Sequence, residues 1–137
     1  NMRALFNLKF LTFLVCVFMF YPCLSKWEKF REYNVFIEYL DLGSVKKISN
    51  IIFVWSMIDY KEPQQNGNLS TKYYSKYDCN EKRFKNISII EYKTSMGRGR
   101  NFKYKKNITN ESTDSKWLYP SIDSPNYAKI KFICNIQ

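Results

Sequence analysis

The sequence predicts a single small α+β domain, in which a β-sheet of about five or six strands is followed by a C-terminal helix. A length of 137 residues favours one domain. Five segments between residues 35 and 108 are rich in β-branched and aromatic residues and are separated by turn residues. Ser124 and Pro125 then form a typical helix start, with a capping hydroxyl before a proline.

Residues 1–25 are predicted to be a secretory signal that is cleaved after Ser25. A short positive start precedes an apolar run of about 12 residues, which is shorter than the roughly 20 that a membrane-spanning helix needs. Small residues then follow at Cys23 and Ser25, where a signal peptidase reads the chain. Residues 26–137 would form the exported domain. An uncleaved N-terminal anchor is the alternative.

The first half of the exported domain is predicted to hold two strands. Residues 26–33 are expected to form a loose turn or a short helix. Residues 35–40 alternate like a strand, which residues 41–44 end, and residues 45–48 could form one helical turn. Residues 51–60 predict a second, central strand because they are apolar on both faces until Asp59.

The second half is predicted to hold three more strands and the helix. Residues 70–78 form the third strand after an Asn66-Gly67 turn signal. Residues 83–94 form the fourth, with room for a bulge between Phe84 and Ile90 where the alternation changes parity. Residues 102–108 add a lysine-rich edge strand. A last strand over residues 130–133 competes with the helix, which we prefer. The predicted core comprises Trp55, either Phe53 or Val54, Phe84 and Ile89.

The charge of the domain predicts anionic partners. Loss of Arg3 and Lys9 with the signal lowers the formal net charge from +10 to +8. The densest basic run is interleaved with Phe102 and Tyr104. Anionic glycans or a lipopolysaccharide surface suit it, and nucleic acid is disfavoured because an exported protein seldom meets it. A solvated basic edge that binds no ligand is the alternative. Trp117 and Tyr119 are additional contact candidates, although for Trp117 we prefer a lid that folds over the sheet. The candidate binding surface comprises Arg98, Arg100, Lys103, Lys105, Lys106, Trp117 and Tyr119.

The cysteine and histidine counts restrict the chemistry. Cleavage leaves Cys79 and Cys134, and an even pair in an exported chain favours a disulfide over two unpaired buried thiols. The absence of histidine removes Ser-His-Asp and Cys-His arrangements and any zinc site that includes histidine. We therefore expect no enzymatic activity, no cofactor, no metal and no small-molecule substrate.

Several short motifs, in this order, resemble the bacterial surface-adhesin protein E family. They are Leu40 to Val45, Phe53 to Tyr60, Leu69 to Lys72, Asp78-Cys79, Arg83-Phe84, Met96 to Gly99, Trp117 to Pro120, Ser124 and Cys134. The resemblance implies an exported, non-enzymatic protein with an antiparallel sheet and a C-terminal helix.

The same resemblance implies binding to host matrix proteins such as vitronectin and laminin. The protein could lie in the periplasm, on the outer-membrane surface or outside the cell. A periplasmic structural or envelope protein resting against lipopolysaccharide is the alternative function, and a homodimer is left open.

Overall fold

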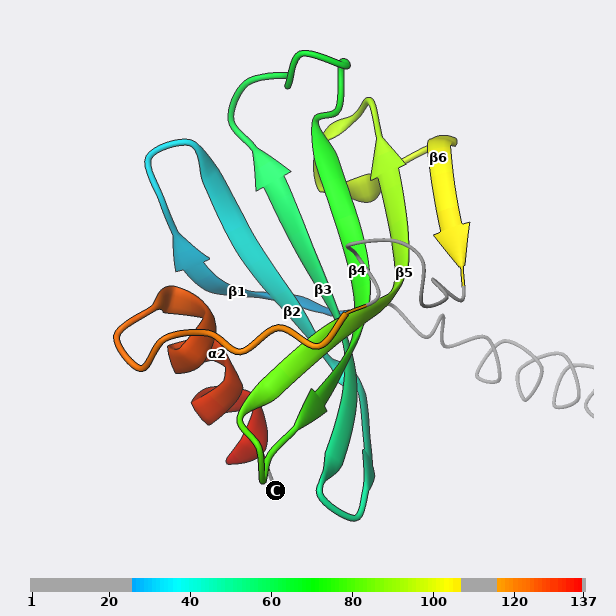
Figure 1. The fold of residues 1–137 in the computed structure, drawn as a ribbon. Coiled ribbons are helices and arrows are strands. Elements are labelled where there is room, and N and C mark those ends of the chain that lie inside the picture. Colours follow the sequence, from blue (N-terminus) through cyan, green and yellow to red (C-terminus); the bar gives the residue numbers. More distant parts are fainter. Residues whose placement is uncertain (1–25, 107–115, 137) are drawn as a thin grey trace, which may run out of the picture.

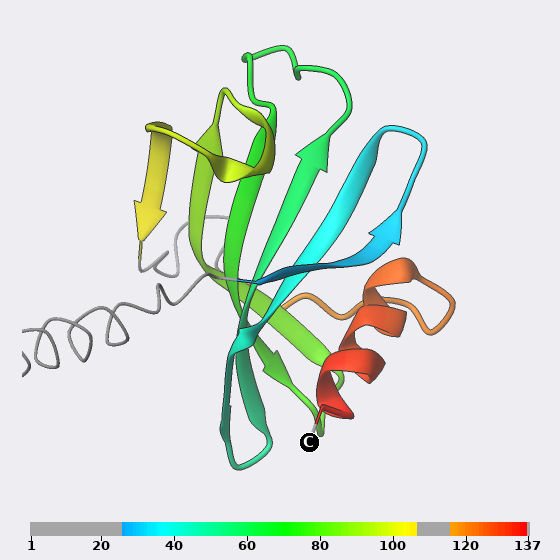
Figure 2. The ribbon, with the colours of Figure 1, turned by 180° about the vertical axis from the view of Figure 1, so that it is seen from behind.

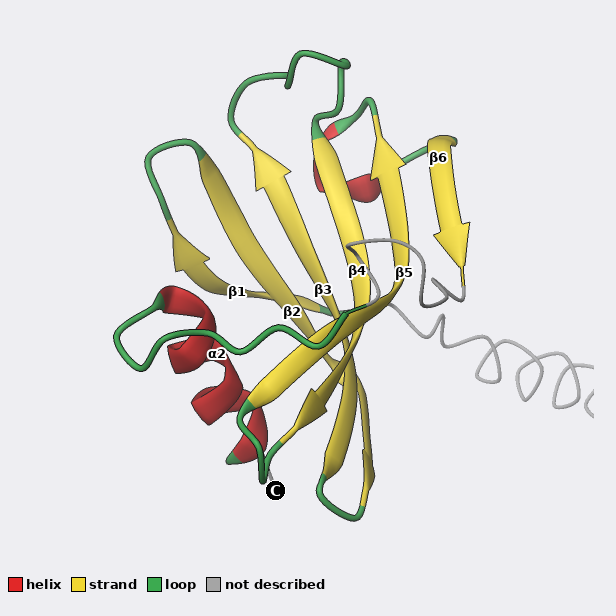
Figure 3. Ribbon diagram, viewed as in Figure 1, coloured by secondary structure: helices red, strands yellow, loops and turns green. Residues whose placement is uncertain are grey.

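The structure is a computed structural model that describes residues 26–106 and 116–136. It contains one antiparallel sheet of six strands in sequential order, followed by helix α2 (Figure 1, Figure 3). This confirms the predicted single α+β domain. The strands are β1 (Trp27–Glu32), β2 (Phe36–Ile48), β3 (Ile51–Tyr60), β4 (Ser70–Asp78), β5 (Arg83–Tyr92) and β6 (Asn101–Lys106). A 3₁₀ turn, η1 (Ser95–Gly97), precedes β6, and α2 spans Pro125–Cys134.

The prediction for residues 26–33 was wrong, because this segment is the edge strand β1. It pairs with β2, and Phe30 reaches the ring of Phe132 on α2 with centroids 5.1 Å apart. Pairing and packing against distant residues stabilise this strand. Local composition could not show either contribution.

The predicted break and helical turn at residues 41–48 were also wrong, because β2 continues through them. The register jumps from Asp41 opposite Trp55 to Lys46 opposite Phe53, so extra residues bulge out of β2. Ser44 bridges the bulge: its Oγ accepts from the Trp55 N–H at 2.9 Å and donates to the Asp41 carbonyl at 2.7 Å. A side chain thus supplies a hydrogen bond that the strand backbone loses there.

The predictions for β3 to β6 are confirmed at the level of elements. β5 carries the expected bulge, because the register shifts where Tyr74 lies opposite Ser88 but Ser75 lies opposite Asn86. The strands twist strongly, and the β2–β3 hairpin extends below the rest of the sheet (Figure 2).

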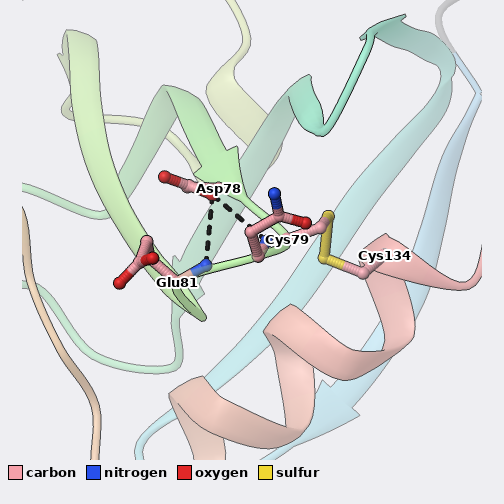
Figure 4. The surroundings of a disulfide bond; sticks show 5 residues. Asp78, Cys79, Glu81 and Cys134 are labelled. Carbon is pink, nitrogen blue, oxygen red and sulfur yellow. Dashed lines mark hydrogen bonds between the residues drawn. A yellow bond between two sulfur atoms is a disulfide. The ribbon is translucent and has the colours of Figure 1, made fainter.

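Helix α2 starts as the sequence predicts, with the Ser124 Oγ accepting from the Tyr127 N–H at 3.2 Å. It ends at a disulfide between Cys134 and Cys79, whose Cα atoms are 5.6 Å apart (Figure 4). The predicted pairing is therefore confirmed. It joins the helix to the β4–β5 turn, which Asp78 holds by accepting from the backbone N–H groups of Asn80 and Glu81.

The core lies between α2 and one face of the sheet. A buried ion pair crosses this interface, with Lys129 Nζ 2.5 Å from Glu38 Oε1. The fully buried members of the core cluster are Leu40, Ile52, Val54, Tyr77, Ile130 and Ile133.

The prediction that Trp55 is a core residue was wrong. Strand side chains alternate between faces, so burial of Val54 against the helix directs Phe53 and Trp55 to the opposite face. Both are half-buried there, as Ile89 is elsewhere in the sheet, and Phe84 is a partly buried neighbour of the core.

Candidate functional site

The sheet face opposite α2, called the open face below, carries a row of aromatic side chains. Trp27, Asp41, Trp55 and Tyr74 lie opposite one another on β1 to β4 and therefore share this face. Tyr74 stacks on Trp55 with ring centroids 5.0 Å apart and on Phe53 with centroids 6.0 Å apart. Residues that sequence periodicity assigned to the core thus form a half-exposed aromatic surface.

The segment before α2 extends this surface beyond β5. Leu118 exchanges two backbone hydrogen bonds with Phe84, at 2.8 and 3.1 Å. Phe84 packs on the helix side of the sheet, so the neighbours of Leu118, Trp117 and Tyr119, lie on the other side beside β4 and β5. The sequence favoured a lid over an exposed contact for Trp117, and the structure shows a half-buried side chain beside β5.

Three cations converge on Trp117. The Arg83 guanidinium carbon is 4.4 Å from the ring centroid, and the Nζ atoms of Lys85 and Lys76 are 5.2 and 5.6 Å from it. Each lies within the range of a cation–π contact. Arg83 also donates to the Tyr119 hydroxyl at 2.8 Å. We call Lys76, Arg83, Lys85, Trp117 and Tyr119 the Trp117 cluster.

The Trp117 cluster has an excess of positive charge. Arg83 is paired with Asp78, its Nε lying 3.0 Å from Oδ2. Burial would raise the pKa of Asp78, but the N–H groups of Glu81, Arg83 and Asn80 outweigh it and hold that pKa below its usual value. Hydrogen bonding to Tyr119 is the largest cause of the raised pKa of Arg83.

Lys76 and Lys85 differ from Arg83. They are direct cross-strand partners, and like charges in that position repel each other. Within the described ranges, 26–106 and 116–136, neither of them forms an ion pair. Two positive charges are therefore held side by side around one indole ring.

The basic segment that the sequence singled out lies elsewhere. Arg98 and Arg100 are exposed in the β5–β6 connection. Lys103 is exposed on β6, and its Nζ lies 3.6 Å from Glu91 Oε2. Lys105 and Lys106 pair in register with Ile89 and Ser88. Lys85 and Glu91 are six positions apart on β5, which is roughly 20 Å along a strand. The structure thus separates Arg98 and Arg100 from Trp117 and Tyr119.

The glycine-containing motif before this basic segment has a structural role. The Met96 N–H donates to Asp59 Oδ1 at 2.7 Å, and the Gly97 N–H donates to Ser70 Oγ at 2.8 Å. Gly97 has a φ of +57°, and a Cβ there would lie 2.3 Å from Cε of Lys72. The positive φ favours glycine, and a side chain there would also displace the flexible end of Lys72.

The cations of the Trp117 cluster were missed by sequence reasoning, although a signal existed. Asp78 and Arg83 close the β4–β5 turn, so counting outward from that turn places Lys76 opposite Lys85. Trp117 could not be placed by counting along a hairpin, because β6 and residues 107–115 separate it from β5 in the sequence.

Metal and membrane features were sought in the same residues. Among residues 26–106 and 116–136, no group of three or more His, Cys, Asp or Glu side chains is arranged to hold a metal ion. In these ranges there is likewise no helix with the length and apolar character needed to span a membrane. The predicted signal, residues 1–25, lies outside the described residues.

The class of protein follows from the family comparison. Residues 27–135 match the family model of the surface-adhesin protein E, so the chain belongs to that family. This confirms the resemblance read from the motifs and identifies the domain as that of a surface adhesin, a class of surface or exported protein.

Two solved structures show the same fold. Crystal form II of Haemophilus influenzae protein E has 15% sequence identity and a TM-score of 0.53, over 78% of this chain and 95% of that chain. The selenomethionine form of the same protein also has 15% identity and a TM-score of 0.53, over 76% of this chain and 88% of that one. No curated protein matches the sequence.

Proposed function

We propose that this protein is an exported, non-catalytic adhesin domain that binds anionic glycans through the Trp117 cluster. The observation that carries the proposal is the cross-strand pair Lys76 and Lys85, two cations gathered on Trp117 without an ion-pair partner among the described residues. A bound anion would attract both lysines and so offset their mutual repulsion.

The side chains of the cluster suit a sulfated or carboxylated sugar. Lys76 and Lys85 supply point charges that attract a sulfate or carboxylate group, and they lie beside the guanidinium of Arg83, which bonds to Asp78 and Tyr119. Aromatic rings such as those of Trp117 and Tyr119 supply apolar area with a polar tip. Tyr119 is 63% exposed and therefore accessible to a ligand.

Export is part of the proposal and rests on residues 1–25. With the signal cleaved after Ser25, N-terminal sequencing of the exported protein should begin at Lys26. A product that keeps residues 1–25 would contradict cleavage and favour an anchor. The same anionic chemistry occurs in matrix glycans and in lipopolysaccharide, so the binding partner distinguishes an adhesive role from an envelope role.

Binding to three immobilised probes tests the proposal: heparin, lipopolysaccharide and vitronectin. The test variant carries Lys76→Ser and Lys85→Ser. The matched control carries Arg98→Ser and Arg100→Ser, so both variants lose two positive charges. We expect the test variant to lose heparin binding and the control to keep most of it. Binding should weaken steeply with salt, since exposed charges are screened within about 8 Å at physiological ionic strength.

Each outcome has a separate meaning. Equal loss in both variants would show that net charge alone drives binding and would reject the Trp117 cluster as the site. Binding to lipopolysaccharide without heparin would favour the envelope role. Vitronectin binding that survives in the test variant would place matrix-protein contact on another surface.

A further inference from the structure

A hollow at the other end of the open face has a different character from the Trp117 cluster. Its volume is about 270 Å³, close to the lower limit of about 300 Å³ for small-molecule sites. Trp27, Asp41 and Trp55 lie opposite one another across β1, β2 and β3, which sets a carboxylate between two indoles. The residues that line it are Trp27, Asp41, Trp55, Lys72, Ile90 and Tyr92.

A lysine is held among the rings of this hollow. Lys72 Nζ lies 5.5 Å from the ring centroid of Trp27 and 5.0 Å from that of Tyr92, and it donates to the Gly97 carbonyl at 3.1 Å. Burial lowers the pKa of Lys72, while the Asp41 carboxylate acts in the opposite direction. The hollow therefore contains one charge of each sign, and its net charge is zero.

The polar groups can serve a ligand as well as the protein. A carboxylate has about four acceptor positions and an ammonium has three donors, so the contacts within the protein need not exhaust either group. Asp41 is only 8% exposed, which strengthens any hydrogen bond that it makes. Sites with aromatic walls and a few placed polar groups are typical of small-ligand binding.

We infer that this hollow binds one uncharged pyranose ring of a saccharide. The flat C–H face of such a ring is apolar and suits the indoles, and its hydroxyls both donate and accept, which suits a carboxylate beside an ammonium. With one charge of each sign, the hollow favours neither a free anion nor a free cation, and a lipid chain would bury both charges. The inference is independent of the proposed glycan site at Trp117, because it rests on other residues and on a neutral ligand.

The test uses the exported protein labelled with ¹⁵N and four probes, the methyl pyranosides of glucose, galactose, mannose and N-acetylglucosamine. We expect at least one to shift the indole N–H signals of Trp27 and Trp55 saturably, with the Trp117 signal as an internal reference. Affinity should be unchanged between low salt and about 0.5 M salt, because the ligand is neutral. Absence of any shift at about 50 mM of every probe, far above a millimolar dissociation constant, would overturn the inference.

Two variants locate the site. Trp27→Ala should weaken binding about tenfold or more, because it removes one aromatic wall. Asp41→Asn keeps the shape and should also weaken binding, since hydrogen bonds to ionised groups are about twice as strong as neutral ones. The Lys76→Ser/Lys85→Ser variant should bind the pyranoside unchanged. Full affinity in both Trp27→Ala and Asp41→Asn, with the fold verified by circular dichroism, would contradict this location.

Discussion

Replacing Lys76 and Lys85 with glutamine, singly and together, measures the repulsion stored at the Trp117 cluster. Both Nζ atoms lie near one ring centroid, at 5.6 and 5.2 Å. Each single variant should relieve the repulsion. The double variant can relieve it only once, so its change in the free energy of unfolding should fall short of the sum of the single changes.

The geometry sets the size of this shortfall. Two points within those distances of one centroid are separated by no more than about 11 Å, where unit charges repel by about 0.4 kcal/mol in water and about 1.5 kcal/mol at an effective dielectric constant of 20. The Debye length is about 30 Å at 0.01 M salt and about 3 Å at 1 M. Because about 11 Å is an upper limit to the separation, we expect a coupling of at least about 0.4 kcal/mol at low salt and close to zero at 1 M.

Urea unfolding of the four proteins at both salt concentrations provides the assay. Because each variant also loses a cation–π contact, only the non-additive part of the cycle counts. A coupling that is absent at low salt, or that persists at 1 M salt, would refute the reasoning. Heparin provides a functional control: it should raise the stability of the unaltered protein and leave the double variant almost unchanged.

Three further predictions concern stability. Replacing both Cys79 and Cys134 with serine should cost about 4 kcal/mol in urea unfolding, because the disulfide spans a sequence separation of 55 residues. The pKa of Asp78 is lower in the folded state than in the unfolded chain. Its ionised carboxylate therefore stabilises the fold fully above the unfolded pKa of about 3.9, and this stabilisation is lost as the pH falls through the folded pKa. In Asp78→Asn, the free energy of unfolding should fall less steeply with pH on the acid side. Burial would lower the pKa of Lys129, but interactions with Tyr77 and Glu38 outweigh burial and raise that pKa. The charged Lys129 should therefore stabilise the fold below its unfolded pKa of about 10.4, and this stabilisation should be lost as the pH rises through the folded pKa. Thermal unfolding at increasing alkaline pH measures the loss.

Local patterns predicted most of the fold. β3 and β4 could be read from their sequences because both combine strong β-propensity with clear turn residues at their ends. The helix start was equally local, since Ser124 caps it and Pro125 occupies its first turn. The disulfide was predicted because cleavage of residues 1–25 leaves two cysteines, Cys79 and Cys134, in an exported chain.

The errors came from contacts between distant residues. β1 is a strand because it pairs with β2 and packs on Phe132, and β2 survives its bulge because Ser44 bonds to Trp55, eleven positions away. Trp55 was assigned to the core because an apolar strand was assumed to be buried on both faces. Among the described residues, a helix covers one face of the sheet and none covers the other.

The candidate site was predicted in part. Trp117 and Tyr119 were chosen from the sequence, but they were grouped with Arg98 and Arg100, which lie toward the other end of β5. The basic run in the sequence lies in the solvated β5–β6 connection and in β6. The spatial cluster at Trp117 could be found only from the strand register, which places Lys76 opposite Lys85.

A titration of ¹⁵N-labelled protein with a heparin tetrasaccharide tests the central claim most directly, because Trp117 carries its own indole N–H reporter. We expect a saturable shift of the Trp117 signal and of the Lys76 and Lys85 backbone amides, which disappears at 1 M salt. A Trp117 signal that stays fixed while the amides of Arg98 and Arg100 move would contradict it.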